Sequence, residues 1–484
     1  MTQDIEWMKK ILTVYILIFF PVCLLCGQSR EVSFSSSDTL LNRAFNWAAK
    51  RALLYRGDPL DPAGPWYEGS LPGREAFCIR DISHQCIGAQ ILGMDNENIN
   101  MFTKFVGNIS CSKNWCSFWE INRYNMPAPV DYRNDSDFWY NLDANFDIVY
   151  ACRRLYDWTG NKMYITNPAF LNFFDASLNQ YITKWQLEPG TLLERPYNLN
   201  RDTTVQHDFG YGYGLPSYAE SQDRLTMSAD LIAALYQGHI SYSEILMLLG
   251  RKSESSLYRQ RADQYKKVLM NHWWDSETKH FNTWYSGEGK FGKGEGGVYL
   301  LWFDILSDMD LIGPLISDLV DKKWNIENVS YFPYMFYRNG YWQEAYKYLL
   351  YCSDPLTRRR DYPEVSFAVI EGIVQGLMGV SPIASTRTIQ VLFRSTGTSY
   401  ARLKDLNILG TYLDISLEGT KETEVRNSGR LPVIIKAGFT GKYENAFEGD
   451  KSIPVTLSVA DNNMIITWAE FTLDPGQTKC VTVR

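Results

Sequence analysis

The sequence is poor in histidine and lacks the residue spacings that commonly bind metals. Five histidines stand singly at positions 84, 207, 239, 272 and 280, with no CxxC or HExxH pattern. Basic residues are outnumbered by acidic ones: 48 lysines and arginines against 55 acids give a net charge of −7, with no basic stripe to displace counterions from phosphates. We therefore expect no metal, no other cofactor and no nucleic-acid partner.

Long apolar runs are almost absent. The one exception, Ile11–Leu25, follows two lysines and is shorter than the ~20 residues that a membrane-spanning helix needs. It ends in Cys26 and two small or polar residues, which is typical of a cleaved export signal. Residues 1–28 are therefore predicted to be a signal peptide and the protein to be periplasmic or secreted. An uncleaved anchor is the alternative, and the leucines before Cys26 disfavour a lipoprotein.

Cysteines are too few for a disulfide framework in a chain of this length. Seven remain after residue 28: Cys78, Cys86, Cys111, Cys116, Cys152, Cys352 and Cys480. The odd number leaves at least one free thiol. Cys111 and Cys116 could close a small loop in an oxidising compartment, whereas buried free thiols are the simpler expectation.

Aromatic residues, by contrast, are abundant. Fifteen Trp, 31 Tyr and 24 Phe make up 14% of the chain. In an acidic protein this surplus fits a binding cleft lined by flat rings, although core packing accounts for most single aromatic residues.

From residue 36 to about 382 the apolar residues recur at helical spacing, and loops rich in Trp, Tyr, Asn and Gly separate the segments. We predict helices at 40–55, 82–107, 146–158, 170–186, 227–250, 257–271, 299–306, 311–320, 341–351 and 367–378. The segment 111–122 could be a helix or a loop, and Gly238 could divide 227–250 into two. Long loops and the lack of a 34- or 40-residue repeat disfavour bundles and solenoids. The remaining fold is a mainly α (α/α)6 barrel over residues 29–385, with a cleft built by its loops.

After Pro382 the apolar period changes to two. Ile389, Val391 and Phe393 alternate with polar residues, as do Leu413, Ile415 and Leu417, and glycines punctuate the segment at intervals of a strand and a turn. Residues 386–484 are therefore predicted to form a small C-terminal antiparallel β-sandwich domain, which carries no obvious chemistry.

Acidic residues cluster beside aromatic residues in several of the helical loops. Five segments qualify: 75–81, 115–123, 137–147, 207–223 and 361–371. Hydrolysis of a glycoside needs two carboxyl groups that flank the scissile bond, one protonated and one ionised. Most single acids are helix caps or surface charges, so it is their clustering that indicates a sugar-cleaving site.

The order of these clusters resembles that of the six-hairpin glycosidases, the (α/α)6 group that includes glucoamylases and α-rhamnosidases. Arg80-Asp81 at a helix start is similar to the pair with which glucoamylase-like enzymes hold the terminal sugar. Glu220 stands in a loop similar to the one that supplies their general acid, although Ala219 replaces a second acid. Glu327 and Glu364 stand where their substrate-binding loop and catalytic base stand. The resemblance covers residues 40–390 in order and spacing.

The resemblance implies an exo-acting, inverting glycoside hydrolase with Glu220 as general acid and Glu364 as general base. The acid needs a raised pKa, so Glu220 is expected to have the more apolar surroundings. The predicted substrate-binding residues are Arg80, Asp81, Glu75, Trp119, Glu120, Trp139, Asp208, Tyr211 and Glu327. In an alignment to the α-rhamnosidase motif, Glu75 would be the acid instead.

Two rival functions remain open. A polysaccharide lyase or unsaturated-uronyl hydrolase could have the same fold, with His207 or His84 as a base and a cation for the uronate. A glycan-binding protein could keep the cleft without catalysis. The partner in every case is a carbohydrate, an oligo- or polysaccharide.

Overall fold

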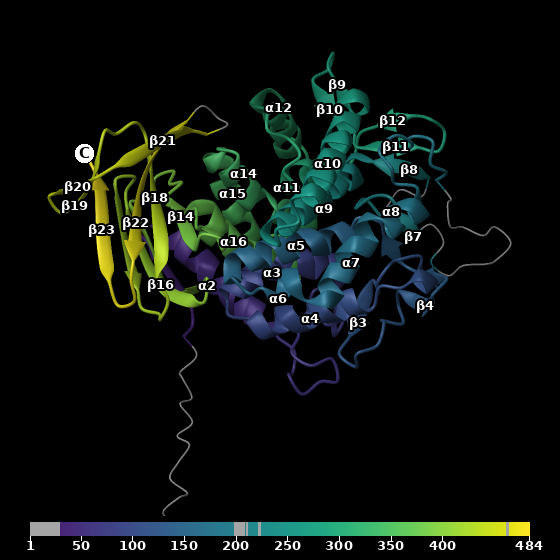
Figure 1. Ribbon diagram of the computed structural model, residues 1–484, viewed down its shortest axis with the longest axis horizontal. Coiled ribbons are helices and arrows are strands. Elements are labelled where there is room, and N and C mark those ends of the chain that lie inside the picture. Colours follow the sequence, from purple (N-terminus) through teal and green to yellow (C-terminus); the bar gives the residue numbers. More distant parts are fainter. Residues whose placement is uncertain (1–29, 198–208, 210–211, 221–223, 461–463) are drawn as a thin grey trace, which may run out of the picture. The chain divides into compact units, whose positions relative to one another are not determined.

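The structure is a computed structural model that describes residues 30–197, 209, 212–220, 224–460 and 464–484. The predicted signal peptide and the site candidates His207, Asp208 and Tyr211 lie outside the described residues. Within the unit Val32–Arg484, helices predominate up to Leu377 and strands follow from Ser381 (Figure 1). The predicted order of a helical part and then a β part is confirmed.

The helical part contains ten longer and five shorter α-helices in the described residues. The longer ones are α2 (Thr39–Leu54), α3 (Ile79–Ile91), α4 (Asp95–Gly107), α5 (Ala144–Thr159), α7 (Pro168–Leu178), α9 (Ala229–Leu248), α10 (Lys252–His272), α12 (Met309–Val320), α15 (Trp342–Ser353) and α16 (Pro363–Glu371). The shorter ones are α6 (Met163–Thr166), α8 (Gln180–Trp185), α11 (Gly297–Trp302), α13 (Ile326–Ser330) and α14 (Phe332–Arg338), with a 3₁₀ turn at Cys111–Lys113 and a π-helical turn at Gly372–Leu377.

Six of these helices contact one another in a closed sequence. Helix α3 packs on α5, α5 on α9, α9 on α11, α11 on α14, α14 on α16, and α16 again on α3. Helices α2, α4, α10, α12 and α15 each pack against a member of this ring. The six helices therefore form an inner layer, and the others lie outside it.

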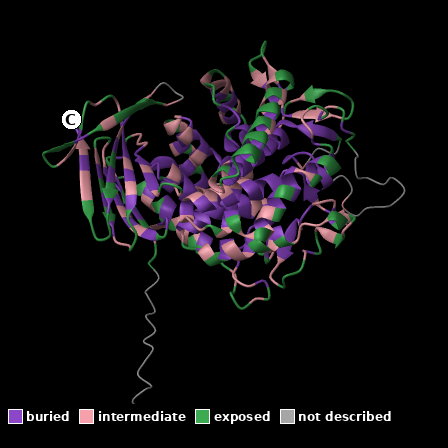
Figure 2. Cartoon of the chain, in the orientation of Figure 1, coloured by how far each residue is buried: buried purple, intermediate pink, exposed green. Residues whose placement is uncertain are grey.

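Burial follows from the sequence of each layer. Helix α9 is apolar or small on nearly every side, and most of its residues are buried. Helix α10 is polar and buries one stripe at spacings of three and four, so its other face meets solvent (Figure 2). The buried positions of α10 are Ser255, Tyr258, Ala262, Tyr265 and Leu269.

Two helix predictions need correction, and two segments that the sequence left open are resolved. The expected helix 170–186 is the two helices α7 and α8, separated at Asn179. The expected helix 82–107 is two helices, because Gly93 adopts φ +80° between α3 and α4. Segment 111–122 is not a helix beyond its 3₁₀ turn, and its end forms the strand Glu120–Asn122. Helix α9 runs unbroken through Gly238, whose missing side chain lets Phe146 of α5 pack against it.

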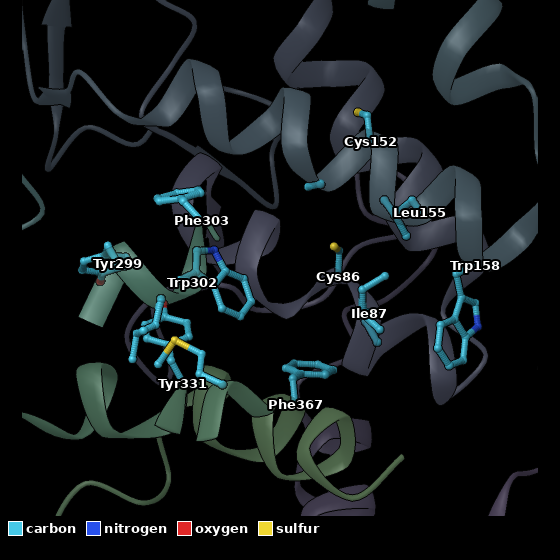
Figure 3. Packing of buried hydrophobic residues seen from close by; sticks show 14 of the residues in the cluster. Cys86, Ile87, Cys152, Leu155, Trp158, Tyr299, Trp302, Phe303, Tyr331 and Phe367 are labelled. Atoms are coloured by element: carbon cyan, nitrogen blue, oxygen red, sulfur yellow. The ribbon is translucent and has the colours of Figure 1, made fainter. Parts of the chain in front are cut away.

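The core at the centre of the ring is aromatic. Side chains from α3, α5, α11 and α16 converge there, among them Cys86, Cys152, Trp302 and Phe367 (Figure 3). All four are buried, and the seven cysteines of the described chain are free thiols. Much of the aromatic surplus is therefore core packing, and Cys111 and Cys116 form no disulfide here.

We expect Gly88→Ala to destabilise the protein. A Cβ at Gly88 would lie 2.3 Å from the carbonyl oxygen of Phe367, so α3 and α16 would have to separate. Overpacking of this kind costs about 1–3 kcal/mol of unfolding free energy. The control is Gly107→Ala in α4, where nothing lies within 4 Å of the added methyl group. Urea unfolding should show a loss for the first variant and none for the second; equal stabilities would contradict the close helix contact.

Short strands occupy the loops of the helical part. They are β2 (Ala76–Cys78), β3 (Glu120–Asn122), β4 (Tyr132–Asn134), β5 (Asp137–Phe138), β6 (Tyr140–Asn141), β7 (Tyr213–Leu215), β8 (Leu225–Ser228), β9 (Trp274–Asp275), β10 (His280–Phe281), β11 (Trp284–Ser286) and β12 (Phe291–Gly292). Their pairing fixes loops that are far apart in sequence: β2 pairs with β3, β6 with β7 and β8 with β11.

The β part contains two sheets in the described residues. Its strands are β1 (Ser33–Ser36), β13 (Ser381–Ile383), β14 (Thr388–Leu392), β15 (Tyr400–Ile408), β16 (Thr411–Glu418), β17 (Glu422–Asn427), β18 (Val433–Thr440), β19 (Ala446–Glu448), β20 (Lys451–Ile453), β21 (Val455–Val459), β22 (Ile465–Leu473) and β23 (Thr478–Val483). The sheet orders are β1-β15-β16-β17-β23-β19-β20 and β13-β14-β18-β22-β21.

Two features of these sheets differ from the expectation of an antiparallel domain confined to residues 386–484. Strands β14 and β18 pair in parallel. Strand β1, from the N-terminal end of the unit, pairs with β15, so the first sheet includes residues from before the helices. The boundary at residues 385–386 stays a prediction.

Candidate active site

A pocket of about 260 Å³ opens where several helix starts and loops of the ring meet. It is smaller than the ~300–1,000 Å³ typical of drug-sized ligands, and it suits roughly one sugar ring. Its lining is Ser70, Leu71, Arg74, Cys78, Arg80, Asp81, Trp119, Glu120, Asp131, Trp139, Glu220, Glu327 and Glu364. The predicted residues among these are Arg80, Asp81, Trp119, Glu120, Trp139, Glu220, Glu327 and Glu364, which come from segments up to 284 positions apart in the sequence.

Arg80 is the central cation of the pocket. Its Nη1 lies 3.0 Å from Oε1 of Glu220, and its Nε lies 3.6 Å from Oδ1 of Asp81. The guanidinium stacks over the ring of Trp119 at 5.2 Å. Both Arg80 and Asp81 occupy the first turn of α3, whose N-cap is Cys78.

The loop that carries Glu220 is held in place by hydrogen bonds to a buried acid of α9. Asp230, fully buried at the start of α9, accepts hydrogen bonds from the Ser217 hydroxyl (2.9 Å) and from the Tyr218 backbone N–H (3.0 Å). Asn141 donates to Oε1 of Glu220 at 3.3 Å. The carboxyl group of Glu220 is thus held between Asn141 and Arg80.

Glu364 has a different environment. It lies in the first turn of α16, after Pro363, and is only 7% exposed. Burial, together with the nearby carboxyl groups of Glu327 and Asp81, raises its pKa well above the ordinary value. The side chain of Glu220, by contrast, is 41% exposed and ion-paired. The expectation that Glu220 has the more apolar surroundings is therefore wrong.

The acids next to Glu364 also favour their protonated forms. Burial raises the pKa of Asp81 to about 7; Arg80 opposes this shift, and the charges of Glu327 and Glu220 add to it. Burial likewise raises the pKa of Glu327, again with Arg80 opposing. Burial therefore disfavours the ionised forms of the acids at this end of the pocket.

A second charged cluster lines the same pocket. Arg74 Nη2 lies 2.9 Å from Oε2 of Glu120 and 2.6 Å from Oδ2 of Asp131. Burial and a hydrogen bond shared with Asp131 raise the pKa of Glu120 to about 8. Arg74 and Asp131 were missed as site residues. Arg74 could have been found from its place in the charged segment 72–85, whereas Asp131 had no comparable signal.

A buried polar network lies beneath Arg80. Tyr218 donates a hydrogen bond to Asp147 at 2.7 Å, and Nε2 of His84 lies 3.0 Å from the same carboxyl group. The other His84 nitrogen contacts the Tyr331 hydroxyl. Burial lowers the pKa of His84, and its side chain does not line the pocket. His84 is therefore badly placed to act as the base of a lyase.

Glu75 also lies outside the pocket. It has φ +53°, its side chain is more than half exposed, and it pairs with Arg123 at 2.7 Å. The prediction that Glu75 binds substrate or donates the proton is not supported by this position. The close spacing of the charged residues in 72–81 did not reveal the positive φ of Glu75 or its ion pair with Arg123.

The buried acids give the stability of the protein a defined pH dependence. Burial raises the pKa of Asp147 to about 8, as it does for Glu120, so the folded protein keeps protons that the unfolded chain releases near pH 4. The stabilising contribution is complete below pH 4 and is lost as the pH rises through about 8. Each such proton changes the free energy of unfolding by up to about 1.4 kcal/mol per pH unit.

We therefore expect urea unfolding to give a lower free energy at pH 8 than at pH 6.5. The Asp147→Asn variant should show a smaller difference between the two pH values, because one linked proton is removed. An unchanged difference would contradict the assigned protonation of Asp147.

Other site types find little support. Among the described residues, no group of three or more His, Cys, Asp or Glu side chains is arranged to hold a metal ion. In the same part of the chain, no helix combines the length and hydropathy needed to cross a membrane.

Comparison with solved structures identifies the fold. An alpha-L-rhamnosidase from Dictyoglumus thermophilum matches 94% of this chain with a TM-score of 0.60 and 15% identity, over 50% of its own length. A GH78 family rhamnosidase of Bacillus sp. GL1 matches 83% with a TM-score of 0.55 and 13% identity, over 42% of its length. A rhamnosidase from Klebsiella oxytoca with rhamnose bound matches 71% with a TM-score of 0.51 and 11% identity, over 65% of its length.

The likeness to the six-hairpin glycosidases is confirmed at the level of fold, and most of the structural neighbours are glycosidases. This chain spans about half the length of the first of them. No family model and no curated protein sequence matches it.

Proposed function

We propose that the protein is an exported glycoside hydrolase that cleaves a terminal sugar from an oligo- or polysaccharide. The observation that carries the proposal is the pocket. Glu220, Glu364 and Arg80 all line this one space, which is large enough for about one sugar ring. The closed sequence of helix contacts and the two sheets support the detailed fold that we propose. It is an (α/α)6 barrel over residues 29–385 with a β-sandwich domain over residues 386–484.

We propose an inverting mechanism in which two carboxyl groups act on opposite sides of the scissile bond. The roles we propose are the reverse of those expected from the sequence, because Glu364 is the more buried of the two acids. Glu364, whose pKa burial raises, donates a proton to the leaving oxygen. Glu220, which is paired with Arg80 and reached by solvent, activates the water. The carboxyl groups should then be ~6.5–9.5 Å apart across the bound sugar.

The remaining lining residues orient the sugar. Arg80 and Asp81 can donate charge-assisted hydrogen bonds to its hydroxyl groups, and Trp119 or Trp139 offers a ring face for stacking. The small volume of the pocket favours one sugar ring at a chain end, hence exo action. Glu327 extends the hydroxyl-binding wall next to Glu364.

The lyase alternative is less well supported. Of its two candidate bases, His84 is buried behind the pocket and His207 lies outside the described residues. Loss of catalysis has no supporting observation, since the pocket keeps several carboxyl groups. Export rests on residues 1–28 alone, and a periplasmic or secreted location follows from it.

The test is a panel of aryl glycosides and oligosaccharides incubated with the protein in H₂¹⁸O. A hydrolase incorporates ¹⁸O into the newly formed reducing sugar. A lyase gives an unsaturated product without the label, and a binding protein gives no product. Either of the last two results would overturn the proposal.

A further inference from the structure

The two basic side chains that line the pocket, within the described ranges, are Arg74 and Arg80. Each is already occupied by two carboxyl groups. Arg80 contacts Glu220 and Asp81, whereas Arg74 contacts Glu120 and Asp131. The positive charge of each guanidinium group is therefore balanced by carboxyl groups of the protein itself.

The geometry leaves little freedom to redirect either arginine. The Arg80 side chain is 13% exposed and is stacked at 5.2 and 5.6 Å on the rings of Trp119 and Tyr218. Arg74 Nη2 is shared between two carboxyl oxygens at 2.9 and 2.6 Å. A ligand anion would have to displace a protein carboxylate from one of these pairs before it gained a cation.

The other acids of the pocket would oppose such an anion. Glu327 and Glu364 form no ion pair with an arginine or lysine of the described chain, and burial raises the pKa of each. Burial therefore makes ionisation of both carboxyl groups less favourable. In the protonated state they donate hydrogen bonds to neutral oxygens, and in the ionised state they repel negative charge.

We propose that the sugar bound in this pocket is uncharged, recognised through its hydroxyl groups, and that uronic acid and sulfated sugars are excluded. The inference rests on the proposed function only for the identity of the ligand as a sugar. It follows from the ion pairs that both arginines form with protein carboxyl groups and from the excess of acids over bases in the lining. Both features disfavour the binding of an anion.

The first arm of the test is isothermal titration of the full-length protein with matched sugars that differ only at C6. The pairs are glucose with glucuronate, galactose with galacturonate and mannose with mannuronate; rhamnose is added as an uncharged deoxy sugar. At least one neutral sugar should bind, and its uronate should bind at least about tenfold more weakly. A uronate that binds as well as its partner, or no binding by any neutral sugar, would overturn the proposal.

The second arm releases one arginine. Asp131→Asn removes the carboxylate that lies 2.6 Å from Arg74 Nη2, so the ratio of the affinities for neutral sugar and uronate should shrink severalfold. At about pH 9, above the pKa of about 8 to which burial raises Glu120, Glu120→Gln removes the second carboxylate and should act in the same direction if Asp131→Asn fails to fold. The control Glu418→Gln breaks an ion pair with Arg402 on the β part. It should leave the ratio of the affinities for neutral sugar and uronate unchanged.

The two proposals fail separately. Binding of neutral sugars without any hydrolysis would overturn the hydrolase assignment and leave the selectivity intact. Hydrolysis of a uronide in preference to its neutral counterpart would overturn the selectivity and leave the hydrolase assignment intact.

Discussion

Replacing Glu364 by glutamine should lower kcat on an unactivated glycoside by about 10²–10⁴-fold, the usual contribution of a general acid. Glutamine matches the size of the buried, protonated carboxyl group but cannot donate an acidic proton to the leaving oxygen. The fold should survive, because Glu364 already favours its neutral form. Initial rates on a natural oligosaccharide measure the effect.

The leaving group separates the two catalytic roles. On a dinitrophenyl glycoside, whose leaving group needs no proton, the Glu364→Gln variant should recover most of the wild-type rate. Glu220→Gln should stay slow on both substrates, because water activation is needed in each case. The opposite pattern would restore Glu220 as the acid and contradict the roles proposed from burial.

Glu344→Gln is the matched control for these variants. Glu344 occupies the first turn of α15, as Glu364 does in α16, but it does not line the pocket. Its replacement should leave the rates on both substrates unchanged. A large loss in this control would show that the effect of Glu364→Gln arises from helix stability rather than proton donation.

Arg80→Met should be the most destabilising change in the pocket. It leaves Glu220 and Asp81 without their shared cation. Removing one partner of a fully buried ion pair costs about 3–5 kcal/mol, and the 41% exposure of the Glu220 side chain should place the loss below that range. Sugar binding should also be lost. Urea unfolding measures the first effect, and titration with the best ligand measures the second.

Arg402→Met is the control for Arg80→Met. Arg402 also pairs with a glutamate, but the pair lies at the surface of the β part, where salt bridges contribute little. Its unfolding free energy should change only slightly. Equal losses in the two variants would mean that Arg80 is not the buried centre of an ion-pair network.

The sequence pattern predicted the helical part well because inner and outer helices differ in apolar periodicity, as α9 and α10 do. Single glycines were harder to interpret. Gly93 ends a helix through its positive φ, while Gly238 sits inside one because Phe146 needs the space. Whether a glycine ends a helix or lies inside one depends on how the neighbouring helix packs, which the local sequence does not show.

Most residues of the pocket could be predicted from the sequence, because charged residues clustered beside aromatic ones indicated the loops that form it. The burial of each acid could not be predicted in this way. Glu220 and Glu364 look equally apolar in their local sequence, yet the structure leaves one half exposed and buries the other against Glu327 and Asp81. Arg74 and Asp131 meet only through the folded loops before α3 and β4, so no local pattern marked their pairing.

The measurement that tests the central claim most directly is a ¹H NMR time course of wild-type protein acting on its best substrate from the panel. If Glu364 protonates the leaving group while Glu220 activates water across the sugar, the first-formed product has the inverted anomeric configuration. A product that retains the configuration of the substrate, or no hydrolysis of any glycoside, would contradict the account.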